Sequence, residues 1–208
     1  MASKGKFISI EGLDGCGKTT QIKLLEKYLI DQGIESVLTR EPGGTPGAEE
    51  IRRVLLKGDL GKWDGIAEAL LLFAGRRDHV QKTIKPALRE GKVVISDRFF
   101  DSTTAFQVFG QGIDWDHINA IRQLSIGDFS PDQTIIFDMD HEKGVDRSIV
   151  KNRFENMKMD FHKRVREGYQ KIAERDEERC RVLNVDGLSI PEVHKKVIKL
   201  IDPVLKQS

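Results

Sequence analysis

The feature that most constrains this chain is a glycine-rich loop between an apolar strand and a helix. Residues 12–19 read GLDGCGKT, which fits the pattern G-x-x-x-x-G-K-[ST]. Residues 7–10 before it form a short apolar run, and apolar residues recur at helical spacing from Thr20 to Asp31 after it. In this context the pattern predicts a phosphate-binding loop rather than a plain glycine turn with a solvated lysine. A nucleoside triphosphate with magnesium is the expected ligand.

Each part of the loop has a physical task. Glycines let the backbone wrap closely around an anion with its N–H groups pointing inward, and the helix N-terminus adds positive potential. Lys18 is expected to reach the outer phosphates, and the hydroxyl of Thr19 is expected to ligate Mg²⁺. The residues expected to bind the nucleotide are Gly12, Leu13, Asp14, Gly15, Cys16, Gly17, Lys18, Thr19 and Thr20.

Five short β-rich runs alternate with longer helical stretches. The predicted strands are 7–10, 36–39, 93–96, 134–137 and 182–185. The predicted helices are 20–31, 49–57, 65–90, 115–126, 152–179 and a last one that a capping box at 189–192 opens and that runs to residue 205. This alternation predicts an α/β fold with a five-stranded parallel sheet and helices on both faces, as in the three-layer fold of P-loop NTPases. We expect one domain over residues 1–208.

Composition excludes several classes of protein. The 208 residues include 34 basic and 33 acidic side chains, a formal net charge of +1, which argues against a dedicated nucleic-acid binder. The longest apolar run, Ala69–Ala74, is far shorter than the roughly 20 residues that span a bilayer, so we expect no membrane association. The two cysteines, Cys16 and Cys180, form no disulfide framework or metal motif. A cytoplasmic protein is expected.

Arginines lie where strands end. In open α/β sheets ligands bind beyond the carboxyl ends of the strands, and Arg40 and Arg98 follow two of them. Arg52 and Arg76 lie on neighbouring predicted helices. Any one of these arginines alone could be a surface ion pair, but together they predict a second anionic pocket, because the guanidinium fork suits phosphate. The acceptor would be a phosphorylated compound, as in a kinase that acts on a nucleoside monophosphate.

Two aspartates belong to the same pattern. Asp97 ends an apolar strand, as the magnesium-supporting aspartate of P-loop proteins does. Asp14 lies inside a loop built to bind anions, where a carboxylate opposes the task of the loop. It either faces solvent or accepts a hydrogen bond from a hydroxyl group of a second substrate.

These residues together resemble the bacterial thymidylate kinases, which transfer the γ-phosphoryl group of ATP to dTMP. The resemblance covers most of the chain and is far more specific than the phosphate-binding loop alone. It is carried in order by FISIEGLDGCGKTT (7–20), TREPGGTPGAEEIR (39–52), AEALLLFAGRRDHV (67–80), VVISDRFFDSTTAFQ (93–107), GDFSPDQTIIFDMD (127–140) and DFHKRVREGY (160–169).

The resemblance implies roles for individual residues. Asp14 would accept the deoxyribose 3′-hydroxyl, and Asp97 would lie near the magnesium ion. The arginines that would surround the dTMP phosphate are Arg40, Arg52 and Arg98, with Glu41 ordering the substrate side. Arg76 would hydrogen-bond a thymine carbonyl, and the base would be bordered by Ser102, Phe106, Gln107, Leu72 and Phe73, where Leu72 stands at the position of the phenylalanine that usually stacks on thymine.

A lid is also implied. Because Gly15 stands where one branch of the family has an arginine, this chain resembles the other branch, in which arginines of a mobile lid supply charge to the transition state. The lid would span about residues 144–159, with Arg147, Lys151 and Arg153 as candidates. The catalytic set implied in this way is Lys18, Asp97, Arg98, Arg147 and Arg153.

Two other functions stay open at this stage. Another small kinase on this fold could phosphorylate a nucleoside, a different nucleotide or a small alcohol, although the arginines argue against a neutral acceptor. A nucleotide-dependent switch would bind nucleotide without acceptor-dependent turnover. Members of the family usually form homodimers; the apolar helix 65–75 is compatible with that but could equally fill the core of one chain.

Overall fold

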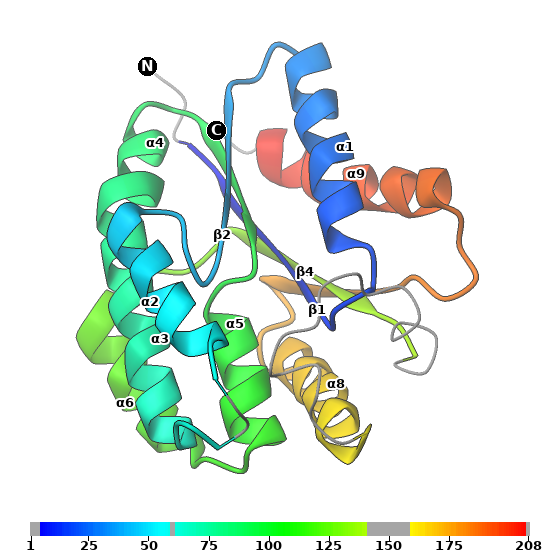
Figure 1. The fold of residues 1–208 in the computed structure, drawn as a ribbon. Coiled ribbons are helices and arrows are strands. Elements are labelled where there is room, and N and C mark those ends of the chain that lie inside the picture. Colours follow the sequence, from blue (N-terminus) through cyan, green and yellow to red (C-terminus); the bar gives the residue numbers. More distant parts are fainter. Residues whose placement is uncertain (1–4, 59–60, 141–158, 207–208) are drawn as a thin grey trace.

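A parallel five-stranded sheet forms the centre of the molecule (Figure 1). The computed structural model describes residues 5–58, 61–140 and 159–206. The strands are β1 (Phe7–Gly12), β2 (Ser36–Arg40), β3 (Val93–Asp97), β4 (Gln133–Asp138) and β5 (Cys180–Asn184). Their order across the sheet is β2-β3-β1-β4-β5, and every neighbouring pair is parallel. The glycine-rich loop therefore leaves the middle strand, and the strand carrying Asp97 lies directly beside it.

Helices cover both faces of the sheet (Figure 1). They are α1 (Lys18–Asp31), α2 (Pro46–Leu56), α3 (Gly65–His79), α4 (Lys85–Arg89), α5 (Phe100–Thr103), α6 (Trp115–Ile126), α8 (Met159–Arg175) and α9 (Ile190–Lys206), with π-helical segments η1 (Val80–Ile84) and η2 (Thr104–Gly110). Helices α1 and α9 pack on one face of the sheet, and the remaining helices lie toward the other. Within the described part of the chain, no helix is both long and apolar enough to cross a membrane.

Side chains along β1 alternate between the two faces of the sheet, and those on one face are apolar whereas Ser9 and Glu11 on the other are polar. Ile8 and Ile10 face α1 and α9 and belong to a purely apolar core. Ser9 and Glu11, on the opposite face, are buried polar groups at 0% exposure. Burying a carboxylate is costly unless it is hydrogen-bonded, so Glu11 constrains what can pack on this face.

The helix predicted over 65–90 is confirmed as one continuous stretch with an internal π-helical segment, η1. The helix predicted from residue 49 begins earlier, at Pro46, because the side chain of Thr45 accepts a hydrogen bond from the backbone N–H of Ala48 and proline is favourable at the first helical position. The helical stretch 100–110, formed by α5 and η2, has no predicted counterpart. Its β-branched and aromatic residues have low helix propensity, and packing against α8 stabilises it instead.

The prediction of one helix over 152–179 is wrong at its C-terminal end, and residues 152–158 lie outside the described residues. Helix α8 ends at Arg175, because the carboxylate of Asp176 accepts hydrogen bonds from the backbone and guanidinium of Arg179 and turns the chain. The last strand accordingly begins at Cys180 rather than 182. The predicted start of the last helix is confirmed: Glu192 accepts from the backbone N–H and the hydroxyl of Ser189.

Glu11 ties the middle strand to the segment after β3. Its Oε1 accepts hydrogen bonds from the Ser9 hydroxyl (2.8 Å) and the Phe99 backbone N–H (2.6 Å), and its Oε2 accepts from the Ser102 hydroxyl (2.5 Å). Burial, reinforced by the nearby Asp101 carboxylate, raises its pKa from 4.5 to about 7. The ends of β1 and β3, which carry the phosphate-binding loop and Arg98, are thus held together by one buried carboxyl group.

This raised pKa predicts a pH-dependent stability. Glu11 releases its proton more readily in the unfolded chain, so its protonation favours the folded state below pH 4.5, and this contribution is lost as pH rises through about 7. The free energy of unfolding of the wild type minus that of Glu11→Gln should therefore fall between pH 4.5 and 7, by on the order of 3 kcal/mol. Urea titrations at several pH values measure this difference. Glu177→Gln, at an exposed position, is the control; a difference that stays flat or rises with pH contradicts the prediction.

Candidate functional site

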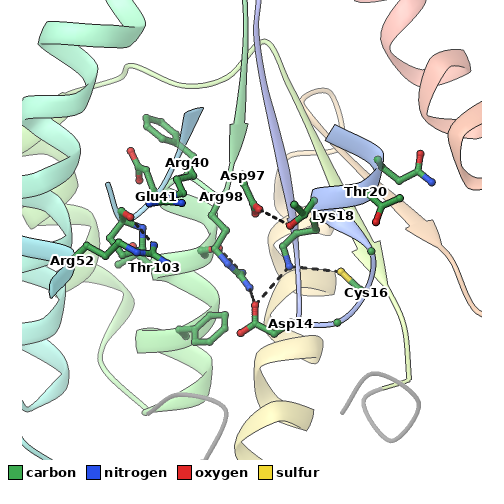
Figure 2. A pocket seen from close by; sticks show the side chains of 18 of the residues that line it. Asp14, Cys16, Lys18, Thr20, Arg40, Glu41, Arg52, Asp97, Arg98 and Thr103 are labelled. Carbon is green, nitrogen blue, oxygen red and sulfur yellow. Dashed lines mark hydrogen bonds and ion pairs between the residues drawn. The ribbon is translucent and has the colours of Figure 1, made fainter. Parts of the chain in front are cut away.

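A cavity of about 900 Å³ opens at the carboxyl edge of the sheet. It begins at the phosphate-binding loop, passes the ends of β2 and β3, and reaches α3 and η2. Figure 2 shows its two halves, with Lys18 and Thr20 on one side and Arg40, Glu41 and Arg52 on the other. Most predicted site residues line it: Asp14, Gly15, Cys16, Gly17, Lys18, Thr19, Thr20, Arg40, Glu41, Arg52, Leu72, Arg76, Asp97, Arg98, Ser102, Phe106 and Gln107.

The backbone of the loop requires its glycines. Gly12, Gly15 and Gly17 have φ angles of 131°, 79° and 93°, a region that other residues rarely adopt. A Cβ on Gly12 would also lie 2.5 Å from the carbonyl oxygen of Phe137. Helix α1 begins directly after Gly17 without a side-chain cap and with no acidic residue in its first turn. Its first N–H groups and its dipole therefore face the cavity, as an anion site requires.

Lys18 lies folded against the loop. Its Nζ donates hydrogen bonds to the carbonyl oxygens of Gly12 (3.0 Å) and Leu13 (2.8 Å) and lies 3.9 Å from the carboxylate of Asp14 (Figure 2). Only 6% of this residue is exposed. The positive charge of Lys18 is thereby held at the loop, beside the N–H groups that would bind a phosphate.

A hydroxyl and a carboxylate meet beside the loop. The Oγ1 of Thr19 lies 3.4 Å from the Oδ2 of Asp97, which ends β3. Both side chains line the cavity. Oxygen ligands of this kind suit Mg²⁺, which takes few protein ligands and completes its shell with water and phosphate oxygens.

Asp14 and Arg98 form an ion pair across the cavity. The Nη2 of Arg98 donates to the Oδ1 of Asp14 at 2.7 Å (Figure 2). Its Nη1 donates to the hydroxyls of Ser102 and Tyr169, each at 3.0 Å. Burial alone would raise the pKa of Asp14, but the charges of Arg98 and Lys18 outweigh it and lower that pKa to about 2. Asp14 is therefore an ionised hydrogen-bond acceptor that Arg98 holds, and 37% of its side chain stays exposed at the cavity.

Two further guanidinium groups, those of Arg40 and Arg52, lie beside this pair. Arg40 donates to both oxygens of Glu49, and Arg52 donates to the carbonyl oxygen of Pro42 at 2.7 Å. Burial, followed by the positive charges of Arg40 and Arg98, lowers the pKa of Arg52. A site in which cations oppose one another in this way electrostatically favours a bound anion.

The far end of the cavity is built from buried polar groups. Arg76, 3% exposed, donates from Nε to Glu41 at 2.6 Å and from Nη2 to the hydroxyl of Thr103 at 3.0 Å. His79 contacts the other oxygen of Glu41 at 2.9 Å. Within the described chain, the Nη1 of Arg76 has no hydrogen-bond partner, and neither has the Oε1 of Gln107. Two residues that line the cavity thus keep one donor and one acceptor without a partner among the described residues.

Some predicted residues lie elsewhere. Phe73 is 1% exposed and does not line the cavity; its ring packs beneath the guanidinium of Arg76 at 4.5 Å, and Leu72 forms the wall instead. The expectation that the Phe73 ring borders the base directly is therefore not met. Gly12 and Leu13 lie behind the loop surface. The proposed lid residues Arg147, Lys151 and Arg153 lie outside the described residues.

Sequence reasoning missed several residues of the site. Thr103 lines the cavity, and Glu11 and Tyr169 hold the side chains that reach it. On the side of the loop, the cavity is lined by Val185, Leu188, Ile190 and Val193. The rule that ligands lie beyond strand ends could have found Val185 and Leu188, which follow β5. Glu11 gives no such signal, because its role depends on chain segments distant in sequence.

Comparisons with known proteins point to one protein family. The model of the thymidylate kinase family matches residues 10–197. A thymidylate kinase of Symbiobacterium thermophilum is 43% identical over 201 residues, which are 96% of this chain and 94% of that protein. One of a Geobacillus species is 46% identical over 187 residues, covering 87% and 89% of the two chains.

A solved structure is similar to this chain in both sequence and fold. The crystal structure of thymidylate kinase from Ehrlichia chaffeensis superposes with a TM-score of 0.78 and 42% sequence identity, over 95% of this chain and 98% of the other. Sequence and fold therefore agree over nearly the whole length. The chain belongs to the thymidylate kinase family.

Proposed function

We propose that this chain transfers the γ-phosphoryl group of ATP to dTMP, giving dTDP and ADP. The observation that carries this proposal is one continuous cavity with the glycine-rich loop at one end and a cluster of three arginines, followed by buried polar groups, at the other. Such a cavity suits two phosphate-bearing substrates placed end to end. Membership of the thymidylate kinase family supports the same reading.

The ATP half consists of the loop and the apolar residues beside it. Loop N–H groups and the N-terminus of α1 would bind the β- and γ-phosphates, with Lys18 moving from the loop carbonyls to the phosphate oxygens. Val185, Leu188 and Val193 offer an apolar surface for the adenine base.

Magnesium fits the donors present. Thr19 and Asp97 bring a hydroxyl and a carboxylate within 3.4 Å of each other next to the loop, and they would hold the ion directly or through water. When bound, Mg²⁺ neutralises charge on the β- and γ-phosphates.

The acceptor half would place the dTMP phosphate among Arg40, Arg52 and Arg98. In this position an oxygen of the acceptor faces the γ-phosphorus, and in-line attack requires no strong base because the acceptor is already an anion near neutral pH. Arg98 would stabilise charge on the transferring group, since its guanidinium is held by Ser102, Tyr169 and Asp14. Asp14 would then be available to accept the 3′-hydroxyl of the deoxyribose.

The base would lie against Arg76 and Gln107. Among the residues that the structure describes, the Nη1 of Arg76 and the Oε1 of Gln107 have no partner, so the first can donate to thymine O4 and the second can accept from N3–H. Ser102, Phe106 and Leu72 line the neighbouring walls.

The lid and the domain organisation belong to the same proposal. Residues 144–159 would close over the phosphates within a single domain, and Arg147 or Arg153 would add positive charge to the transition state. A cytoplasmic location without a nucleic-acid partner remains our expectation.

The acceptor is predicted to be dTMP. A coupled assay that detects ADP, run with dTMP, dUMP, UMP, CMP and AMP, should give the highest kcat/KM for dTMP. A clear preference for another acceptor contradicts the proposal, and ATP binding without acceptor-dependent turnover would identify a nucleotide switch.

Arg98 is predicted to be needed for turnover. Arg98→Ala should lower kcat by about 10²-fold or more, because one preorganised donor is removed from the transferring phosphoryl group. Arg181→Ala is the matched control, since Arg181 lies on β5 outside the cavity and contacts only the carbonyl oxygen of Cys180 among the bonds that the structure gives it. Thermal unfolding checks that both variants are folded; near-normal turnover in folded Arg98→Ala would remove Arg98 from the mechanism.

A homodimer is also proposed. Large apolar side chains are exposed on α3 and on the two helices that pack against it, α2 and α6: Leu70 at 51%, Val54 at 43% and Leu124 at 89%. Light scattering at micromolar concentration should give the mass of two copies. Leu124→Glu should shift it toward one copy, whereas Ile30→Glu, at an equally apolar exposed position on α1, should not. A monomeric wild type refutes the proposal.

A further inference from the structure

We propose that Glu68 fixes the orientation of the Gln107 amide and thereby makes the acceptor pocket reject cytosine. Glu68 lies in the first turn of α3, is 1% exposed and does not line the cavity. It would be a positioning residue that never touches substrate. The inference rests on the proposed function and names the group that determines which pyrimidine is accepted.

The contacts of Glu68 select one of two amide orientations. Its Oε2 accepts hydrogen bonds from the Nε2 of Gln107 at 3.1 Å and from the Nε2 of Gln111 at 2.6 Å. A side-chain amide has a donor end and an acceptor end of nearly the same shape, so only its partners determine which end points where. The acceptor oxygen of Glu68 holds the NH₂ end of Gln107, because the opposite orientation would set two oxygens against each other.

The consequence lies on the cavity side of Gln107. This residue is 1% exposed and lines the cavity, and its Oε1 is buried without a hydrogen-bond partner among the described residues. Turned in this way, Gln107 can only accept a hydrogen bond from a ligand. A buried acceptor that the ligand fails to satisfy costs binding free energy, so the orientation discriminates between ligands.

Pyrimidine bases differ at the edge that this oxygen would meet. Thymine and uracil carry a hydrogen on N3 and an acceptor oxygen at C4, whereas cytosine has an unprotonated N3 and a donor amino group at C4. The acceptor of Gln107 and the donor of Arg76, neither of which has a partner in the described part of the chain, match the first pattern. Both groups oppose cytosine, with lone pair against lone pair at N3 and donor against donor at C4.

Arg76 and Gln107 are oriented by different carboxylates. Glu41 holds Arg76, and Glu68 holds Gln107. Arginine has only donors, so changing its partner cannot convert it into an acceptor. Glutamine can change role if it rotates. Discrimination through Glu68 should therefore be removable on its own, leaving the part that Arg76 supplies.

The test is the variant Glu68→Gln. An amide at position 68 can donate or accept, so Gln107 becomes free to turn its NH₂ group toward N3 of cytosine. The kcat/KM ratio of dTMP to dCMP should fall by roughly tenfold or more, without reaching unity because Arg76 still opposes the amino group. The ratio of dTMP to dUMP should stay within twofold, since both bases present the same edge. Where dCMP turnover is too slow, its competitive inhibition constant against dTMP gives the same comparison.

Two further variants separate this role from a structural one. Gln111→Met removes the other amide that donates to Glu68 but does not line the cavity, so both ratios should stay as in the wild type. Gln107→Leu should itself reduce the preference over dCMP, and adding Glu68→Gln to it should cause no further change. Ratios are independent of the folded fraction, and if Glu68→Gln yields no folded protein, Gln107→Leu alone decides.

The outcomes are distinct. An unchanged dTMP to dCMP ratio in Glu68→Gln, or equal shifts in both ratios, overturns the inference while leaving the proposed function intact. An unchanged ratio in Gln107→Leu overturns it as well. A wild type that does not prefer dTMP contradicts the proposed function itself.

Discussion

The ion pair between Arg98 and Asp14 joins the two halves of the cavity. Arg98 follows the end of β3 and Asp14 lies in the loop after β1, so a 2.7 Å hydrogen bond fixes the distance between the expected acceptor and donor sides. The backbone of Arg98 has a φ of 72°, uncommon for a residue other than glycine, and its N–H bonds to the carbonyl oxygen of Ile10 at 3.0 Å. The hydrogen bond to the middle strand therefore stabilises this strained backbone conformation. The conformation in turn directs the guanidinium group into the cavity.

Buried carboxylates orient the side chains and the chain segment that carry the positive charges of the site. Glu11 holds the segment after β3 through Phe99 and Ser102, and Glu41 holds Arg76 at 2.6 Å. Each of these carboxylates is buried and already satisfied by protein donors, so it is preorganised before any ligand arrives. One cation that lines the cavity, Arg76, is partly unsatisfied instead, because its Nη1 has no partner within the described chain. Binding free energy is thus available where substrate would contact the protein.

Sequence patterns predicted the parts of this arrangement that depend on neighbours along the chain. The loop motif, the strand ends and the alternation of strands with helices are local signals, and they correctly placed Lys18, Thr19, Arg40 and Arg98 around one cavity. The stretch 100–110 could not be predicted in this way, because its residues favour other conformations and it becomes helical through packing on α8. Phe73 shows the same limit on a smaller scale: one position of helical rotation moves its ring from the cavity wall to a place beneath Arg76.

Residues that orient others are harder to predict from sequence than residues that touch a ligand. A glutamate in the first turn of a helix, such as Glu68, ordinarily indicates a favourable interaction with the helix dipole on the surface. Its burial and its contact with Gln107, 39 positions away, become visible only in the fold. Yet a reversible amide depends on such a partner more than an arginine does, because the partner alone determines whether the amide donates or accepts. Pockets that recognise bases through amides should therefore carry part of their specificity one residue farther from the ligand than pockets that use arginine.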